Sequence, residues 1–444
     1  MDEDITRRGF IAGAAALGAA GMAGGLAACS SDDSDGASGS DGTKGTTAKS
    51  TTTAQQTQKL PKPEDAPFDH VVVVMMENRS FDALLGWLPG ADGKQAGLTY
   101  TDTKGDTYDT WRLAPDWTGC DMQDPFHFSA AVAKQFNDGK IDGFLTSQPV
   151  GDKFPLGYYT DEDLPILAKL ATSYTTFDNY FSAMLGPTWP NRFYQLSATT
   201  DVFETGNFPK EGEERPSALD LAIFDRLMEK DLTSKYYSPG EPMTLLYQSK
   251  KYDALTVPYE EFLSDAKDGK LPHVSFVDPD YTAEAELKGL SNDFHAYGDV
   301  RAGDAFLAEV HDAIANSPQW DRTIMVINFD EHGGFFDHVV PPKVEDDTVV
   351  DGPVPDLKNL GFRVPAIVVS PFAPDKIETD GPYEHTSILK MIEWRWGLEP
   401  MTVRDAQAKN LAEALDFSKR RNPVKLPDVP KPDVHACNNP DHVG

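Results

Sequence analysis

Apolar residues in this chain gather in short, continuous runs bounded by polar residues. The clearest runs cover residues 68–76, 273–277, 323–329 and 364–370. Runs of this length, with many β-branched residues, predict buried strands. The run at 68–76 is continuous in the way that central strands of parallel sheets are. Shorter stretches near 174–180 and 235–237 predict further strands or the loops that approach them.

Segments with a helical spacing of apolar residues lie between these runs. The clearest is 299–316, where Phe306, Val310 and Ile314 fall on one stripe. Residues 164–170, 218–230 and 388–396 predict three more helices. Because strands and helices alternate along the chain, the sequence predicts an α/β fold class.

Domain organisation follows from composition. Residues 30–65 consist mainly of Ser, Thr, Gly, Asp and Gln, and predict a disordered tether. The length of the remainder allows two or three domains, but no second linker or internal repeat divides it, so one large domain is expected over residues 66–418. Residues 419–444, rich in Pro, Lys and Asp, predict a poorly structured tail.

Ionisable residues cluster directly after the strand predicted at 323–329. Five of them occupy positions 330–338, around the pair Gly333 and Gly334: Asp330, Glu331, His332, Asp337 and His338. Neighbouring side chains of a strand point to opposite faces, so Asp330 and Glu331 serve one site only if the strand has already ended. The two glycines supply the irregular backbone this requires. Carboxylate and imidazole donors suit a divalent cation, although an acidic surface turn is the alternative interpretation.

The strand predicted at 68–76 also ends in polar residues. Glu77 and Asn78 follow it, then Ser80. The carboxyl ends of strands are where open α/β sheets bind ligands, so this is a second candidate ligand group. In the alternative interpretation, Ser80 only caps the next helix and Glu77 is a surface acid.

A third candidate segment is Gly-Pro-Thr-Trp-Pro-Asn-Arg at residues 186–192. Gly-Pro ends the preceding element, and a Thr cap followed by Pro190 predicts the start of a helix. Unpaired N–H groups and the positive dipole end make a helix N-terminus a natural phosphate site. Asn191 and Arg192 add neutral and charged donors. The alternative is an ordinary capped helix, with Thr188 as its cap.

The first 29 residues predict an export signal. Arg7 and Arg8 form a twin-arginine motif, and the apolar run at 11–26 is too short and too rich in Ala and Gly for a good membrane span. The run closes on Leu-Ala-Ala-Cys, which resembles a bacterial lipobox with Cys29 as the lipidated residue. We therefore expect twin-arginine export and an extracytoplasmic protein that is lipid-anchored to the membrane or secreted.

Net charge and cysteine content limit the possible partners and cross-links of the chain. The net charge is −31, which argues against nucleic acid as a partner and against electrostatic adhesion to anionic lipid. Besides Cys29, the chain has two cysteines, Cys120 and Cys437. They are a possible disulfide pair in an oxidising compartment, and two free thiols are the alternative.

Five motifs in this order resemble the bacterial phosphoesterase family, which contains phosphatidylcholine-type phospholipases C and the respiratory-burst-inhibiting acid phosphatase. They are VVVVMMENRSFD at 71–82, GPTWPNR at 186–192, NDFHAYGDVRAGDAF at 292–306, VINFDEHGGFFDHVVPP at 326–342 and VPAIVVSP at 364–371. The resemblance covers about residues 66–398. It implies an alkaline-phosphatase-like fold: a central, mostly parallel sheet with helices on both faces and the site at the carboxyl ends of the strands.

The resemblance also implies roles for individual residues. Glu77, Asn78, Asp330 and Glu331 correspond to metal ligands, for Zn, Fe, Mn or Ca. Thr188 corresponds to the hydroxyl nucleophile, which is Thr in the phospholipase branch and Ser in the acid-phosphatase branch. His127 and His295 correspond to histidines that bind phosphate or protonate the leaving group, although His127 in isolation suggests only a packed or solvated histidine. Asn191 and Arg192 are expected to bind substrate, whereas His332, His338 and His385 receive no role.

Hydrolysis of a phosphoester is the chemistry these residues can perform. A cation lowers the pKa of a hydroxyl and offsets the charge of the phosphate, which allows attack and a phospho-threonine intermediate. We expect a phospholipase C that releases diacylglycerol and a phosphorylated head group, acting on a phospholipid or a small phosphoester. The alternatives are an acid phosphatase on the same scaffold and a surface lipoprotein that only binds phospho-ligands. Compared with the longer phospholipases of this family, we expect the chain to lack their extra C-terminal domains after about residue 400.

Overall fold

The computed structural model describes residues 60–205, 221–240, 242–247, 249–349 and 355–437. The predicted signal, Cys29 and nearly all of the predicted tether therefore lie outside the described residues. The last residues of the tether are described: η1 (Pro63–Asp65) packs on the domain, and Arg395 Nη1 donates a hydrogen bond to the carbonyl of Pro63 at 3.2 Å. The packed chain thus begins a few residues before the predicted boundary at 66.

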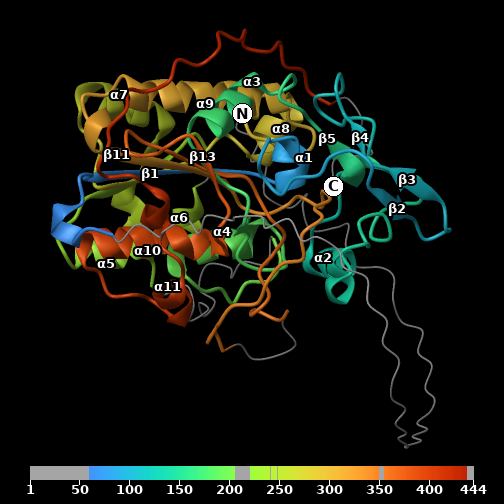
Figure 1. Ribbon diagram of the computed structural model, residues 1–444, viewed down its shortest axis with the longest axis horizontal. Coiled ribbons are helices and arrows are strands. Elements are labelled where there is room, and N and C mark those ends of the chain that lie inside the picture. Colours follow the sequence, from blue (N-terminus) through green and yellow to red (C-terminus); the bar gives the residue numbers. More distant parts are fainter. Residues whose placement is uncertain (1–59, 206–220, 241, 248, 350–354, 438–444) are drawn as a thin grey trace, which may run out of the picture. The chain divides into compact units, whose positions relative to one another are not determined.

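A single large sheet forms the centre of the described chain (Figure 1). Its eight strands follow the order β13-β6-β12-β11-β1-β10-β8-β9. Their bounds are β1 (His70–Met76), β6 (Thr175–Phe177), β8 (Ser234–Ser238), β9 (Thr256–Pro258), β10 (Val274–Val277), β11 (Thr323–Phe329), β12 (Ala366–Val369) and β13 (Lys376–Glu378). The predicted strands at 68–76, 273–277, 323–329 and 364–370 are therefore confirmed to within a few residues.

The sheet is parallel except for β12, which runs antiparallel to both of its neighbours, β11 and β6. The sequence did not indicate this direction. The chain leaves β11 at its carboxyl end, where residues 330–338 follow the strand. It then re-enters the sheet from the same edge, where Ala366 pairs with Asn328. A mostly parallel sheet is confirmed, and its interior strands are buried on both faces, as their continuous apolar runs require.

Helices cover both faces of the sheet, as Figure 1 shows. On one face lie α3 (Pro165–Ser173), α7 (Tyr259–Asp268) and α9 (Val300–Ala315), and on the other α4 (Thr188–Ser197), α5 (Ile223–Met228), α10 (His385–Trp396) and α11 (Val403–Gln407). The stripe predicted on 299–316 is buried, with Phe306, Val310 and Ile314 in the core. The α/β class with helices on both faces is therefore confirmed.

Shorter elements surround this core. The remaining helices are α1 (Phe81–Leu85), α2 (Ser129–Phe136), α6 (Met243–Leu246) and α8 (Ala283–Lys288), and the remaining strands are β2 (Thr99–Thr101), β3 (Thr107–Asp109), β4 (Trp111–Arg112), β5 (Gly157–Tyr158), β7 (Tyr180–Phe181) and β14 (Tyr383–Glu384). The 3₁₀ turns after η1 are Asn137–Gly139, Phe154–Leu156, Lys250–Leu255, Trp320–Arg322 and Leu411–Ala414. Among the described helices, none combines the length and apolar character needed to cross a membrane.

The tail beyond residue 418 forms neither helix nor strand over its described part, yet it is packed. Arg421 Nη1 donates to the carbonyl of Ser173 at 2.6 Å, and the backbone N–H of Val424 donates to the Tyr174 hydroxyl at 3.0 Å. Farther on, Cys437 forms a disulfide with Cys120, with 5.4 Å between the two Cα atoms. Of the two possibilities for these cysteines, the structure therefore has the pair.

Candidate active site

The residues that follow the two central strands lie close together. β1 and β11 are adjacent and parallel, and their last residues, Met76 and Phe329, are partners in register. Glu77 and Asn78 thus emerge beside Asp330, whose Oδ1 accepts a hydrogen bond from the Asn78 backbone N–H at 2.9 Å. The strand has ended before Asp330, so the side chains of the acids after it need not point alternately to opposite faces of the sheet, as predicted.

Gly333 and Gly334 allow three loops to meet at this point. Gly333 has φ of 59°, and a Cβ on it would lie 2.2 Å from the carbonyl oxygen of Asn78. Gly334 has φ of 73°, and its Cβ would lie 2.7 Å from Pro125. A side chain at either position would be strained, because the backbone conformation disfavours it and neighbouring atoms would have to shift. The loop after β11 therefore packs between the loop after β1 and the loop that carries His127.

Thr188 joins the same group from α4. Its side chain is 4% exposed, and its Oγ1 lies 3.3 Å from Oε1 of Glu77 and 3.3 Å from Oδ1 of Asn78. The prediction that Thr188 caps the helix is wrong, because the cap residue is Pro187 and Thr188 is the first helical residue. Its hydroxyl is turned away from the helix backbone and toward the ends of the strands.

Buried negative charge exceeds positive charge at this point. Glu77, Asp330 and Glu331 are all buried, and among the described residues Arg192 forms an ion pair with one of them, Asp330. Burial, and next the charge of Asp330, raise the pKa of Glu77 well above its usual range. Burial is also the main cause that raises the pKa of Glu331 to about 8.

A divalent cation fits this donor set. Within the described chain, Oε2 of Glu77 and Oε1 of Glu331 are buried without a hydrogen-bond partner. Buried carboxylate oxygens left in this state are costly unless a proton or a cation compensates them. Glu77, Asn78, Asp330 and Glu331, the predicted ligands, offer oxygen donors of the kind such an ion takes. The donor set therefore suits a metal ion, consistent with the expectation from sequence.

His295 lies between two carboxylates. Its Nδ1 is 2.7 Å from Oε1 of Glu286, and its Nε2 is 3.5 Å from Oδ2 of Asp124. Burial alone would lower the pKa of His295, but Glu286 and Asp124 outweigh it and hold the pKa well above its usual range. The two carboxylates therefore favour the imidazolium form of His295, which suits it either to bind a phosphate or to donate a proton.

His127 lies between this histidine and the nucleophile candidate. The ring centroids of His127 and His295 are 5.8 Å apart, edge to face. Nε2 of His127 lies 3.5 Å from Nδ2 of Asn78, whose amide oxygen faces Thr188, while Nδ1 donates to the carbonyl of Pro125 at 2.7 Å. A continuous row thus runs from Thr188 through Asn78 and His127 to His295.

The structure gives Asn191 a positioning role in place of the predicted contact with substrate. Its amide Nδ2 donates to the carbonyls of Gly186 and Pro187, both at 3.0 Å, and its Oδ1 accepts from Met184 N at 3.0 Å. The fully buried amide group therefore holds the loop before Thr188 in place.

Arg192 makes structural contacts and also has one guanidinium nitrogen, Nη2, that donates to no acceptor in the described chain. Its Nε donates to Asp330 at 3.2 Å, its Nη1 to Asp278 at 3.4 Å, and its guanidinium stacks over Tyr281. Its Nη2 is buried without a partner in the described chain, so binding of a phosphate oxygen by Arg192 stays a prediction.

The histidines that received no role lie outside this row. His332 is buried against Phe362, with Nε2 bonded to Gln135, and burial lowers its pKa to about 3. His385 supports the site indirectly, because its Nε2 donates to the backbone carbonyl of Asp330 at 2.7 Å.

His338 belongs to a separate group that we call the arginine cluster: Asp82, Asp337, His338 and Arg363. The guanidinium of Arg363 binds Asp337 through Nε and Nη2, at 2.9 and 3.1 Å, and Asp82 through Nη2 at 3.1 Å. His338 Nδ1 lies 2.5 Å from Asp82. Of the five ionisable residues after β11, the structure thus brings two into the site and two into this cluster.

Three acids of the site were missed by sequence reasoning: Asp124, Glu286 and Asp293. Oxygen atoms of Glu77, Glu286 and Asp293 lie within 4.8 Å of one another, and so do ligand atoms of Asp124, His127 and His295. Asp124 and Asp293 each stand two or three positions before a candidate histidine, a signal that could have been read. Glu286 is on α8 and gave no such signal.

Comparisons with known proteins agree with this chemistry. The chain matches the phosphoesterase family over residues 68–399. It is 34% identical over 406 residues to non-specific phospholipase C6 of Arabidopsis thaliana, covering 82% of this chain and 76% of that protein. It is 30% identical over 440 residues to phospholipase C B of Mycobacterium tuberculosis, covering 83% and 81%.

A solved structure of an alkaline phosphatase superfamily protein from Vibrio parahaemolyticus matches with a TM-score of 0.39 and 13% identity, over 79% of this chain and 71% of that one. The family match spans the central sheet together with every candidate site residue from Glu77 to Glu331. This chain therefore belongs to the phosphoesterase family, hydrolases that act on phosphoester bonds.

Proposed function

We propose that this protein is a phospholipase C that releases diacylglycerol and a phosphorylated head group. The observation that carries the proposal is the buried hydroxyl of Thr188, 3.3 Å from both Glu77 and Asn78 at the carboxyl edge of the sheet. Relatives named phospholipases C, which align over most of this chain, support the choice of substrate.

The reaction proceeds in two displacements at phosphorus. Oγ1 of Thr188 attacks and its proton passes to Oε1 of Glu77, which accepts its hydrogen bond at 3.3 Å. The bond from phosphorus to the glycerol oxygen breaks with its electron pair on that oxygen, and the imidazolium form of His295 protonates it. Water then attacks the phospho-threonine and gives a proton to His295, the bond to Oγ1 breaks, and Oγ1 recovers its proton from Glu77. In net, one water molecule is consumed, with one hydrogen on each product.

Fixed donors bind the phosphoryl group during both steps. Thr188 is the first residue of α4, so its hydroxyl lies at the N-terminus of that helix, the positive end of the helix dipole. The open Nη2 of Arg192 and the cationic ring of His295 add charged donors. Because phosphoryl transfer depends mainly on positioning and electrostatic stabilisation, such preorganised donors supply most of what the reaction needs.

Glu77, Asn78, Asp330 and Glu331 would hold a divalent cation. When bound, it supplies Lewis acidity that lowers the pKa of a neighbouring hydroxyl and offsets phosphate charge. Elemental analysis of the purified protein decides among Zn, Fe, Mn and Ca.

A comparison of two substrates tests the proposal. Phosphatidylcholine in mixed micelles should yield diacylglycerol and phosphocholine, and p-nitrophenyl phosphate should react much more slowly. A faster reaction with the monoester would establish an acid phosphatase instead. No turnover of either substrate by metal-loaded protein would leave a phospho-ligand-binding protein as the better description.

We propose further that the protein is exported by the twin-arginine route and anchored through lipid on Cys29. The Arg7-Arg8 pair and the small residues before Cys29 support this location. In the producing bacterium, the Cys29→Ala protein should appear in the medium or remain unprocessed. If it stays as firmly bound to membranes as the unaltered protein, another anchor must exist.

A further inference from the structure

A disulfide joins the C-terminal tail to a loop that carries residues of the active site. Cys437 is bonded to Cys120, a separation of 317 positions in the sequence. Cys120 belongs to the loop 116–127, which also carries Asp124 and His127. The disulfide therefore fixes the tail to the loop that supplies one carboxylate partner of His295.

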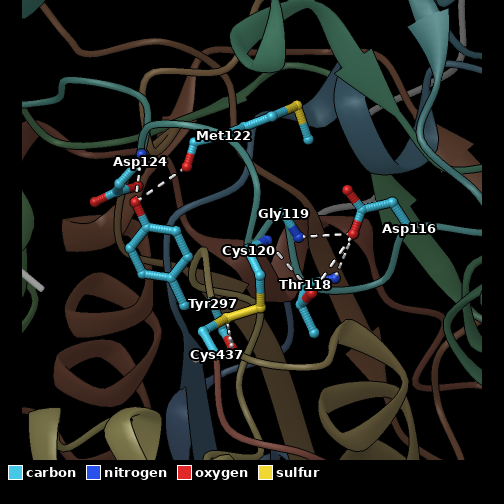
Figure 2. Close-up of a disulfide and its surroundings, with 8 residues drawn as sticks. All are labelled: Asp116, Thr118, Gly119, Cys120, Met122, Asp124, Tyr297 and Cys437. Atoms are coloured by element: carbon cyan, nitrogen blue, oxygen red, sulfur yellow. Dashed lines mark hydrogen bonds between the residues drawn. A yellow bond between two sulfur atoms is a disulfide. The ribbon is translucent and has the colours of Figure 1, made fainter. Parts of the chain in front are cut away.

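Tyr297 links this loop to the segment that carries His295, as Figure 2 shows. Its hydroxyl accepts a hydrogen bond from the Asp124 backbone N–H at 2.8 Å and donates one to the carbonyl of Met122 at 3.3 Å. Its backbone N–H donates to the carbonyl of Thr118 at 2.8 Å. The sulfur of Cys437 lies 3.7 Å from the carbonyl oxygen of Tyr297.

Hydrogen bonds within the loop hold its backbone in place on the side of the disulfide. Oδ1 of Asp116 accepts the backbone N–H groups of Thr118 and Gly119, at 3.1 and 2.8 Å, and Cys120 N donates to the Thr118 hydroxyl at 3.4 Å. Beyond Cys120, the backbone N–H of Met122 donates to the carbonyl of Gly119 at 2.9 Å, so hydrogen bonds connect the disulfide end of the loop to the segment that leads to Asp124.

The tail also packs against the helix that carries Glu286, the second carboxylate partner of His295. Gly289 ends α8, the helix that carries Glu286, and a Cβ on Gly289 would lie 2.4 Å from the backbone N of Ala436. The residues just before Cys437 therefore pack directly against the end of that helix. In this way one short stretch of tail contacts all three segments that hold the His295 ring: loop 116–127, α8 and Tyr297.

We propose that the Cys120–Cys437 disulfide and Tyr297 are positioning elements for His295, and that breaking the disulfide lowers turnover without unfolding the protein. This inference rests on the proposed function. A water-soluble phosphine breaks the bond cleanly: it donates two electrons and becomes the phosphine oxide with oxygen from water, whose two protons complete the two thiols. Phosphines avoid the metal chelation that dithiols bring.

The experiment compares the oxidised full-length chain, the phosphine-reduced chain, Cys437→Ser and Tyr297→Phe. Turnover of phosphatidylcholine should fall about 10-fold in kcat in the three altered forms, with KM nearly unchanged, because a small displacement of a catalytic group slows the chemical step more than binding. Melting temperature and circular dichroism check that each form is folded.

A matched control separates this effect from general loosening of the tail. Arg421 anchors the tail through the carbonyls of Ser173 and Ala373. Arg421→Ala should therefore leave kcat unchanged. If it lowers kcat as much as Cys437→Ser does, the disulfide has no specific positioning role and the inference is overturned.

The imidazole NMR signals of His295, assigned with His295→Gln, give a readout that needs no turnover. They should shift on reduction and in Tyr297→Phe, but not in Arg421→Ala. Unchanged signals and unchanged kcat in the reduced protein would overturn the inference. If the oxidised protein hydrolyses neither phosphatidylcholine nor p-nitrophenyl phosphate, the proposed function fails, while the NMR comparison still decides the positioning claim. Should Cys437→Ser not fold, the reduced chain and Tyr297→Phe carry the same test.

Discussion

The site acids and the acids of the arginine cluster follow the same two strands, but the two groups differ in how far their charge is compensated within the chain. Asp82 follows the end of β1, and Asp337 follows the end of β11, as Glu77 and Asp330 do. Arg363 is buried between Asp82 and Asp337 and bonds to both. At the site, oxygen atoms of Glu77 and Glu331 are left buried without a partner in the described chain.

This difference separates a structural cluster from a ligand site. Asp82, Asp337 and His338 of the arginine cluster lie within metal-binding distance of one another. At the site the same holds for Asp124, His127 and His295, and for Glu77 with Glu286 and Asp293. In the arginine cluster the compensating cation is part of the chain, so the acids fasten the loops that follow β1 and β11. At the site, oxygens of Glu77 and Glu331 have no partner in the described chain, so a proton or a bound cation compensates them. Residue types alone do not distinguish the two cases.

The largest expected effect is at Thr188. Thr188→Val keeps the shape of the side chain and removes its oxygen. Turnover should fall by about three orders of magnitude or more, since a covalent step disappears. The melting temperature should hardly change, because the Thr188 hydroxyl does not cap its helix.

Thr188→Ser is the matched control, and it should retain measurable turnover and form a trappable phosphoserine. Near-normal turnover in Thr188→Val would instead indicate direct attack by water.

Two substitutions that change charge equally test the comparison itself. Asp330→Asn should remove bound metal and lower activity by at least about 100-fold, because even outer partners of metal ligands contribute about 10- to 100-fold to affinity or activity. Asp337→Asn should leave the metal content unchanged and lower the free energy of unfolding by about 3 to 5 kcal/mol, since it breaks a buried ion pair.

Elemental analysis and denaturant titration measure the two outcomes. Full metal occupancy in Asp330→Asn, or metal loss in a folded Asp337→Asn protein, would contradict the assignment of the two clusters.

The backbone between the clusters is the next target. Gly333→Ala places a Cβ against the carbonyl of Asn78 in a left-handed conformation, so the loops after β1 and β11 must separate. We expect a loss of about 1 to 3 kcal/mol in unfolding free energy, together with weaker metal binding.

Gly97→Ala serves as the control, because Gly97 has a φ of 82° but open space around it. It should cost only the strain of the left-handed backbone and leave metal binding intact. Equal effects of the two substitutions on metal binding would argue against a role for loop contact.

The smallest expected effect is a pH dependence of the arginine cluster. Burial lowers the pKa of His338, but its hydrogen bond to Asp82 outweighs this, so the pKa in the folded protein lies above 6.5. The stabilisation is therefore fully present below pH 6.5 and is lost as the pH rises through the folded pKa.

His338→Gln should flatten the fall in unfolding free energy above pH 6.5. The pKa of Asp337, raised to about 6, lowers the free energy of unfolding as the pH rises from 3.8 to about 6, and this lower part of the stability profile should be unaffected. An unchanged stability profile above pH 6.5 in His338→Gln would show that the ion pair with Asp82 contributes nothing.

Much of this protein was determined by local sequence. Continuous apolar runs located the main strands of the sheet, and their polar ends located Glu77, Asn78, Asp330 and Glu331. These features are readable because burial of both faces demands apolar residues over the whole strand, and because the strand must end before its acids can share one site.

The tertiary structure decided the rest, because it depends on residues that are distant in sequence. Contacts between separate segments decide the direction of β12, the ion pairs of Arg363 with Asp82 and Asp337, and the two carboxylates beside His295. The same holds for the bond between Cys120 and Cys437. A residue's type fixes the charge or donor that it offers, but only its neighbours in space decide whether that charge is already compensated, and so whether it builds the fold or binds a ligand.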